Sequence, residues 1–254
     1  MSLGIFDSGV GGLTVYRELA KQFPDTDLIY LGDTARVPYG NKSPDTIIRY
    51  ATECASMLVK RHNVDALVVA CNTISSYAIE NLRSTFGLPV LGVIEAGAEM
   101  AMAVTKNNKI GVLGTIATVR SGAYIKALEE VSDGKAIVSQ RACPLFVPLV
   151  EEGVITGEIP SLVIKMYLDE LIADVDTLLL GCTHYPVLAP LLASIYPEVN
   201  IADSASMMVE HILAGGLATI ESGKREIYVT DITPAFESLK SMLVGDIPMQ
   251  EIDI

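Results

Sequence analysis

Short apolar segments alternate along this chain with longer segments whose apolar residues recur at helical spacing. We expect strands at residues 3–6, 28–31, 66–70, 90–93, 110–113, 136–139, 177–180 and 227–230. Several are apolar at every position, which is typical of strands covered on both faces of a parallel sheet. The segments between them predict helices at residues 13–22, 44–61, 75–86, 121–131, 160–172 and 186–195. This alternation predicts an α/β fold.

One strand-end pattern occurs twice. Segment 68–73 resembles segment 179–184, and each places a cysteine after an apolar strand. Cys71 and Cys182 are 111 residues apart, and a second matched pair, Asp7 and Thr115, is 108 residues apart. The near-equal offsets predict two similar lobes, each a mainly parallel sheet flanked by helices, with the active site in the cleft between them. We expect the first lobe at residues 1–97 plus about 207–254, and the second at residues 98–206.

The composition supports a folded core and limits the partners. Half of the 254 residues are hydrophobic, which excludes intrinsic disorder. The net charge of −13 argues against a nucleic acid or an anionic membrane as partner. We find no long uncharged apolar run and no signal peptide, and none of the four cysteines forms a CxxC pair. We therefore expect a reduced, cytoplasmic protein.

Cys71 and Cys182 are the strongest candidates for chemistry. The carboxyl ends of strands form the ligand crevice in open α/β sheets, and both cysteines follow strands. A buried cysteine often only fills space, and we interpret Cys54 and Cys143 in that way. A thiol acts as a base only as the thiolate, which needs a neighbouring group to assist it. His184 lies two residues after Cys182, and Asp7 ends the first strand as a carboxylate able to relay a proton.

Two loops, and the absence of cofactor motifs, limit the kinds of ligand that we expect at the site. The glycine-rich turn at residues 9–14 matches neither GxGxxG nor a P-loop, but it exposes backbone donors suited to a small carboxylate. The polar loop at residues 32–40 follows the second strand and is typical of a ligand-binding loop. We find no metal-ligand cluster and no lysine signature of a pyridoxal phosphate enzyme.

At these positions the sequence resembles the glutamate racemases of the cofactor-independent aspartate/glutamate racemase superfamily. The matching motifs occupy residues 6–12, 32–40, 70–73, 113–118, 147–151 and 181–186, in the family's order. The departures are small: Thr34 stands where serine is usual, and Ile74 where alanine is common. The resemblance implies racemisation of glutamate without cofactor by two cysteines, in a homodimer that supplies D-glutamate for peptidoglycan.

The resemblance also implies roles for individual residues. Cys182 would deprotonate L-glutamate with help from His184, and Cys71 would deprotonate D-glutamate with help from Asp7. Glu151 matches a further acidic residue near the family's site. The positions that match substrate-binding residues are Asp7, Ser8, Pro38, Tyr39, Gly40, Asn72, Thr73, Thr115, Thr118 and Thr183.

Three alternatives remain open at this stage. The chain could be an aspartate or hydantoin racemase of the same superfamily, although the motifs at 32–40 and 181–186 are closest to glutamate racemases. It could be a non-catalytic two-lobed amino-acid-binding protein, but binding alone needs neither Cys71 nor Cys182. A redox role for the two cysteines predicts a reversible disulfide, which their setting permits but does not require.

Overall fold

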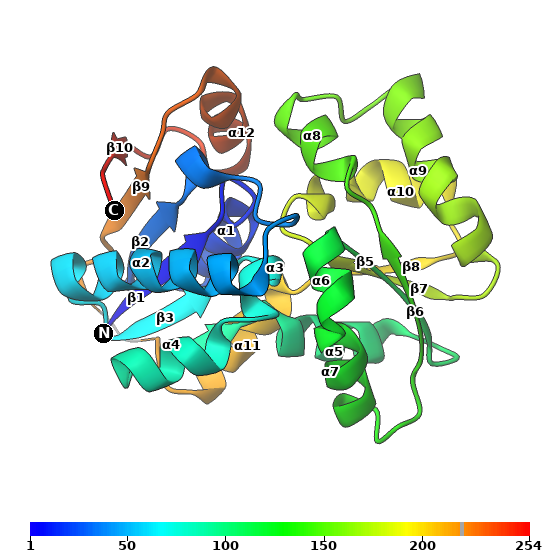
Figure 1. The fold of residues 1–254 in the computed structure, drawn as a ribbon, viewed down its shortest axis with the longest axis horizontal. Helices are drawn as coiled ribbons and strands as arrows, with labels where there is room; N and C mark the ends of the chain where they lie inside the picture. Colours follow the sequence, from blue (N-terminus) through cyan, green and yellow to red (C-terminus); the bar gives the residue numbers. More distant parts are fainter. Residues whose placement is uncertain (219–220) are drawn as a thin grey trace.

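The computed structural model describes residues 1–218 and 221–254 and contains two parallel sheets (Figure 1). The six-stranded sheet has the order β10-β9-β2-β1-β3-β4, and the four-stranded sheet has the order β6-β5-β7-β8. The strands of the larger sheet are β1 (Ser2–Asp7), β2 (Asp27–Gly32), β3 (Ala66–Val69), β4 (Val90–Gly92), β9 (Arg225–Val229) and β10 (Met249–Glu251). Those of the smaller sheet are β5 (Lys109–Gly114), β6 (Ile137–Ala142), β7 (Thr177–Gly181) and β8 (Asn200–Ala202).

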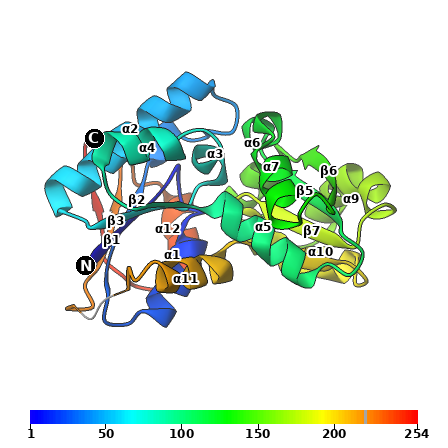
Figure 2. The same cartoon turned by 90° about the horizontal axis from the view of Figure 1, so that it is seen from below.

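Each sheet is covered by helices and forms one lobe. The first lobe has α1 (Leu13–Gln22), α2 (Pro44–His62), α3 (Asn72–Ser75), α4 (Ile79–Phe86) and α12 (Pro234–Val244). The second has α6 (Ile116–Ser121), α7 (Ala123–Val131), α8 (Phe146–Glu151), α9 (Glu158–Ile172) and α10 (Ala189–Ile195). Between the lobes, α5 (Val93–Val104) packs against α11 (Ala205–Ala214) (Figure 2). In the part of the chain that the structure describes, no helix combines the length and apolar character needed to cross a membrane.

The first-lobe strands are apolar at successive positions because helices cover both faces of their sheet. In β2, Leu28 and Tyr30 pack into the cluster that contains α1. The intervening Ile29 and Leu31 pack into the cluster that contains α2. Successive side chains of a strand point to opposite faces, so a strand buried on both sides has no polar alternation. The expected α/β fold with two lobes of parallel strands is therefore confirmed.

The two sheets repeat the same topology. The strand order β2-β1-β3-β4 corresponds to β6-β5-β7-β8. Leu3 pairs with Ala66 in the first sheet as Ile110 pairs with Thr177 in the second. This register matches Cys71 with Cys182, as the sequence predicted. The match of Asp7 with Thr115, which we expected from the sequence, is wrong by one residue. In this register the equivalent of Thr115 is Ser8. Strands β9 and β10, from residues 225–251, belong to the larger sheet. The lobe boundaries that we expected from the sequence stay a prediction.

The sequence expectations fail where a segment is short or apolar on all sides. The helix expected at 75–86 is two helices, α3 and α4, and that expected at 121–131 is α7 alone. Gly122 has a left-handed backbone conformation (φ 67°), which ends α6 at Ser121. Helix α5 was not predicted, since six of its twelve residues are buried and it shows little polar face. Strands β8 and β10 have three residues each, too few for a recognisable pattern.

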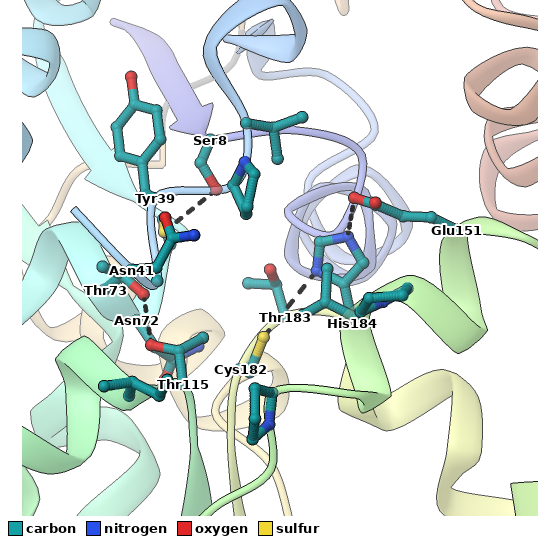
Figure 3. A pocket seen from close by; sticks show the side chains of 18 residues that line it. Ser8, Tyr39, Asn41, Asn72, Thr73, Thr115, Glu151, Cys182, Thr183 and His184 are labelled. Carbon is teal, nitrogen blue, oxygen red and sulfur yellow. Dashed lines mark hydrogen bonds and ion pairs between the residues drawn. The ribbon is translucent and has the colours of Figure 1, made fainter.

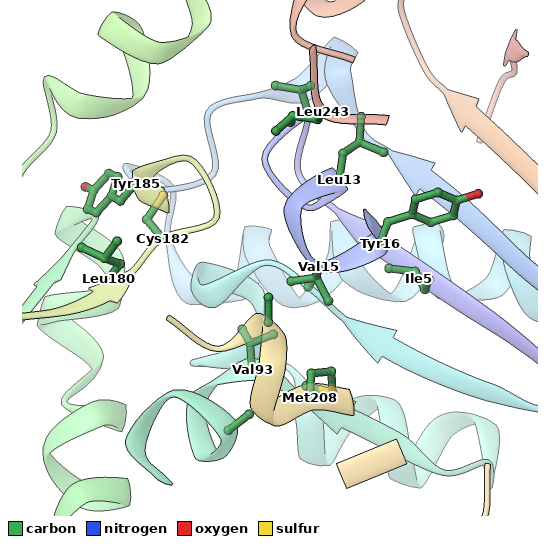
Figure 4. Packing of buried hydrophobic residues seen from close by; sticks show 14 of the residues in the cluster. Ile5, Leu13, Val15, Tyr16, Val93, Leu180, Cys182, Tyr185, Met208 and Leu243 are labelled. Carbon is green, nitrogen blue, oxygen red and sulfur yellow. The ribbon is translucent and has the colours of Figure 1, made fainter. Parts of the chain in front are cut away.

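One hydrophobic cluster extends across both lobes. It contains Leu13 and Val15 of α1, Val93 at the start of α5, and Leu180 and Tyr185 on either side of Cys182 (Figure 4). Each of these side chains is almost fully buried. Because the cluster reaches the residues next to Cys182, the packing of the two lobes fixes the position of that cysteine.

Candidate active site

A pocket lies between the two lobes, where strands of both sheets end (Figure 3). Its volume is about 340 Å³, within the range of small-molecule sites. The lining residues are Ser8, Val37, Pro38, Tyr39, Gly40, Asn41, Cys71, Asn72, Thr73, Thr115, Ile116, Pro144, Val147, Pro148, Glu151, Cys182, Thr183 and His184. They follow β1, β2, β3, β5, β6 and β7, so the carboxyl ends of both sheets meet at one cavity.

Cys71 is a buried thiol in the first lobe. It lies between β3 and α3, with 5% of its surface exposed. Its thiol donates to Ser8 Oγ at 3.6 Å. Burial raises the pKa of Cys71 well above its usual range, and the nearby charge of Asp7 raises it further. The hydrogen bonds that Cys71 makes with the Ile74 backbone and the Ser8 side chain lower this pKa and offset only part of the increase. Cys71 is therefore protonated at neutral pH.

Cys182 lies beside a histidine that carries a proton. His184 Nδ1 is 3.9 Å from Cys182 Sγ, and His184 Nε2 is 3.2 Å from Glu151 Oε1. Burial lowers the pKa of His184, but hydrogen bonds to Cys182 and Glu151 outweigh it and raise the pKa to about 10. A positive charge next to a sulfur favours the thiolate form. The two cysteines thus lie in opposite electrostatic surroundings.

Asp7 lies beneath the pocket and does not line it. Its carboxylate is fully buried and accepts from Gly9 N–H at 2.9 Å and from the Thr183 hydroxyl at 3.3 Å. The second bond joins the lobes, because Asp7 ends β1 and Thr183 follows β7. Only glycine fits at position 11 beside this contact. A Cβ there would lie 2.3 Å from Thr183 Oγ1 and 2.6 Å from His184 Nδ1.

Three threonine hydroxyls form a second contact between the lobes. Thr73 Oγ1 lies 3.0 Å from Thr115 Oγ1 and 3.3 Å from Thr118 Oγ1, and the last two are 3.0 Å apart. Thr118 is fully buried behind the pocket wall and does not line it. Gly40 packs against this group, and a Cβ at Gly40 would lie 2.6 Å from Thr115 Cβ. The cluster leaves hydroxyl groups of Thr73 and Thr115 at the pocket wall.

Asn72 presents an unpaired amide at the pocket. Its Oδ1 accepts from the Tyr124 hydroxyl at 2.5 Å, while its Nδ2 is buried with no hydrogen-bond partner among the described residues. Burying an amide donor without a partner is unfavourable. In the described part of the chain, the structure thus leaves a buried amide donor without a partner on a residue that lines the pocket.

Tyr39 lines the pocket, but its hydroxyl points away from it (Figure 3). The hydroxyl donates to Asp33, which also accepts from Arg36 Nε at 2.6 Å. Burial raises the pKa of Tyr39 far above its usual range, so the hydroxyl keeps its proton. These bonds hold the loop at 37–40 against the cavity, and Gly40 O accepts from Ala117 N–H of the second lobe at 2.9 Å.

The structure brings together all the residues that the sequence assigned to the site. All but Asp7 and Thr118 line the cavity, and those two contact lining residues directly. Sequence reasoning did not single out Val37, Asn41, Ile116, Pro144, Val147 and Pro148. Four of these lie inside the quoted motifs, whereas Asn41 and Pro144 lie next to a predicted loop and a strand end without a distinguishing pattern. No group of three or more residues able to hold a metal ion occurs among the described residues.

Comparisons with known proteins match this architecture. A model of the family described as Asp/Glu/hydantoin racemase matches residues 4–212. The glutamate racemase of Sulfurihydrogenibium sp. is 55% identical, over 100% of this chain and 98% of that protein. A glutamate racemase isoform of Bacillus anthracis superposes with a TM-score of 0.92 at 34% identity, over 100% of this chain and 97% of that chain. The glutamate racemase of Francisella tularensis in complex with D-glutamate gives a TM-score of 0.88 at 35% identity, over 99% and 97%.

Both the family model and the full-length relatives cover the strand ends that form the pocket. With two cysteines at equivalent positions of two repeated lobes, this chain belongs to the Asp/Glu/hydantoin racemase family.

Proposed function

We propose that this chain interconverts L- and D-glutamate without a cofactor, with Cys71 and Cys182 as the two bases. The observation that carries the proposal is the opposite surroundings of two thiols at one pocket. Cys71 is held protonated, and Cys182 lies beside the imidazolium of His184. The relatives that match over the full chain are glutamate racemases, and one of them was solved with D-glutamate.

In the L-to-D direction, the Cys182 thiolate removes the α-proton and becomes a thiol. The electron pair of the broken C–H bond is delocalised into the α-carboxylate. The Cys71 thiol delivers its proton to the opposite face of the α-carbon and becomes a thiolate. The D-to-L direction runs through the same steps in reverse. The α-proton thus leaves from one face of the substrate, and a new proton arrives on the other.

The remaining site residues support this chemistry. Asp7 keeps Cys71 protonated through its charge, and Glu151 keeps the proton on His184. We assign the substrate's carboxylates and ammonium to the backbone of Pro38, Tyr39 and Gly40 and to the side chains of Ser8, Asn72, Thr73, Thr115 and Thr183. Thr118 holds the threonine cluster in place. Donors fixed before the reaction stabilise the carbanion without reorganising, and their interactions with it are stronger where water is excluded.

Replacing either cysteine by serine tests the two-base mechanism. In Cys71→Ser and in Cys182→Ser we expect racemisation of glutamate to fall by about 10²- to 10⁴-fold, because a serine hydroxyl is far too weak a base. Polarimetry or circular dichroism of glutamate, starting separately from each enantiomer, measures the rates.

Cys54→Ser is the matched control for these variants. Cys54 is buried, as the other two are, but it does not line the pocket. We expect this variant to keep most of the wild-type rate. Turnover near the wild-type rate in folded Cys71→Ser or Cys182→Ser would contradict the mechanism.

The proton on His184 predicts a specific pH response. Protonated His184 favours the Cys182 thiolate, so activity should fall as the pH rises through the pKa of His184, near 10. Glu151→Gln removes the negative charge that helps to raise this pKa, so the pKa drops and the alkaline loss of kcat/KM moves to lower pH. Measuring kcat/KM from pH 7 to 10.5 in both proteins gives the shift.

Glu152→Gln controls for the loss of one negative charge, since Glu152 is the exposed neighbour of Glu151 outside the pocket. We expect its profile to follow the wild type. An unchanged alkaline limb in Glu151→Gln would show that Glu151 does not hold the proton on His184.

We also propose that the chain acts in the cytoplasm as a homodimer and supplies D-glutamate for peptidoglycan. The resemblance of its motifs to glutamate racemases supports this, and all four cysteines are free, as in a reducing compartment. Light scattering of the purified protein should give twice the chain mass of 27.2 kDa. A mass of one chain at micromolar concentration would overturn the dimer.

A further inference from the structure

Tyr124 does not line the pocket, yet its hydroxyl contacts Asn72 at the pocket wall. Tyr124 lies on α7 of the second lobe and is fully buried. Asn72 begins α3 in the first lobe, directly after Cys71. The 2.5 Å bond between them therefore crosses from one lobe to the other. None of the sequence motifs includes Tyr124.

Two glycines leave the space that the Tyr124 ring occupies. A Cβ at Gly97 of α5 would lie 2.9 Å from the Tyr124 hydroxyl oxygen. A Cβ at Gly181 would lie 2.8 Å from Tyr124 Cε2. The ring thus fills a slot between α5 and the end of β7 that is open only because both positions lack a side chain. Gly181 directly precedes Cys182, and Asn72 directly follows Cys71. Tyr124 therefore contacts a residue next to each of the two cysteines.

The Tyr124 hydroxyl fixes the orientation of the Asn72 amide. An asparagine side chain has one acceptor oxygen and one NH₂ donor. A tyrosine O–H that donates to Oδ1 leaves Nδ2 on the other side. Nδ2 is buried without a partner among the described residues, and Asn72 lines the cavity. A bound oxygen anion is the group that satisfies this donor.

We propose that Tyr124 is a positioning residue, which orients the Asn72 amide so that its NH₂ group binds a carboxylate of the substrate. The identity of that substrate rests on the function proposed above. Tyr124 touches no reacting atom and acts through Asn72. The Asn72 amide would hold this carboxylate from binding onward, so we expect the loss of the Tyr124 hydroxyl to act mainly on KM.

Tyr124→Phe tests this role, since phenylalanine fills the same slot and removes only the hydroxyl. We expect KM for glutamate to rise about tenfold, the effect of one lost hydrogen bond, with kcat within about twofold of the wild type. Steady-state kinetics with each enantiomer, and calorimetric titration of D-glutamate, measure the change with and without turnover.

Tyr77→Phe is the matched control. The Tyr77 hydroxyl also crosses between the lobes, donating to Ala117 O at 2.9 Å, but it contacts neither Asn72 nor the pocket. We expect its KM to be unchanged. An equal rise in KM in both variants would indicate a general loosening of the lobes and would overturn the positioning role.

A double-mutant cycle with Asn72→Ala separates positioning from a structural effect. If Tyr124 acts through Asn72, Tyr124→Phe changes nothing further in the Asn72→Ala background. Multiplicative effects of the two substitutions would contradict the proposal.

Asn72→Asp is a second variant that keeps an acceptor for Tyr124 but turns an oxygen toward the carboxylate. It should raise KM more than Tyr124→Phe does, and an unchanged KM would also contradict the proposal.

The wild-type protein in the same assays separates this inference from the proposed function. Racemisation by the wild type, with an unchanged KM in Tyr124→Phe, overturns the role of Tyr124 and leaves the function standing. D-Glutamate binding that weakens in Tyr124→Phe, without racemisation by the wild type, supports the role of Tyr124 and overturns the function. A wild type that binds no glutamate overturns both.

Discussion

The two lobes approach each other so closely around the pocket that side chains do not fit at several points of contact. Gly11 lies against Thr183 and His184, and Gly40 lies against Thr115. These close approaches bring hydrogen-bonding groups of one lobe onto the other, including the bond from Thr183 to Asp7. The site is therefore assembled by the packing of the lobes, and each cysteine takes its electrostatic surroundings from that arrangement.

The repeated topology explains why the site holds two thiols, and the differences between the repeats explain why the thiols differ. Cys71 and Cys182 occupy equivalent strand ends in equivalent sheets. The first lobe places a buried carboxylate near its cysteine, which disfavours a second negative charge. The second lobe places a histidine there, which Glu151 on α8 keeps protonated. A symmetric scaffold thus gives the two thiols opposite electrostatic surroundings.

Much of the fold was predictable because parallel strands buried on both faces and amphipathic helices have strong periodic patterns. The helix at 13–22 was predicted to the residue. Helix α5 was missed because burial on several sides removes its polar face. The candidate site was predictable because its residues cluster in motifs at strand ends. Tyr124 could not be found in this way, since its role depends on a contact between segments 52 residues apart in sequence.

Deuterium labelling tests the two-base account most directly. The protein is incubated with L-glutamate in D₂O, and both enantiomers are separated and analysed by mass spectrometry before one tenth of the substrate has reacted. The account predicts D-glutamate that carries deuterium at the α-carbon, because its new proton comes from the Cys71 thiol, which exchanges with solvent. D-Glutamate that retains the substrate's own α-hydrogen would mean that a single group carries the proton between faces, and would contradict the account.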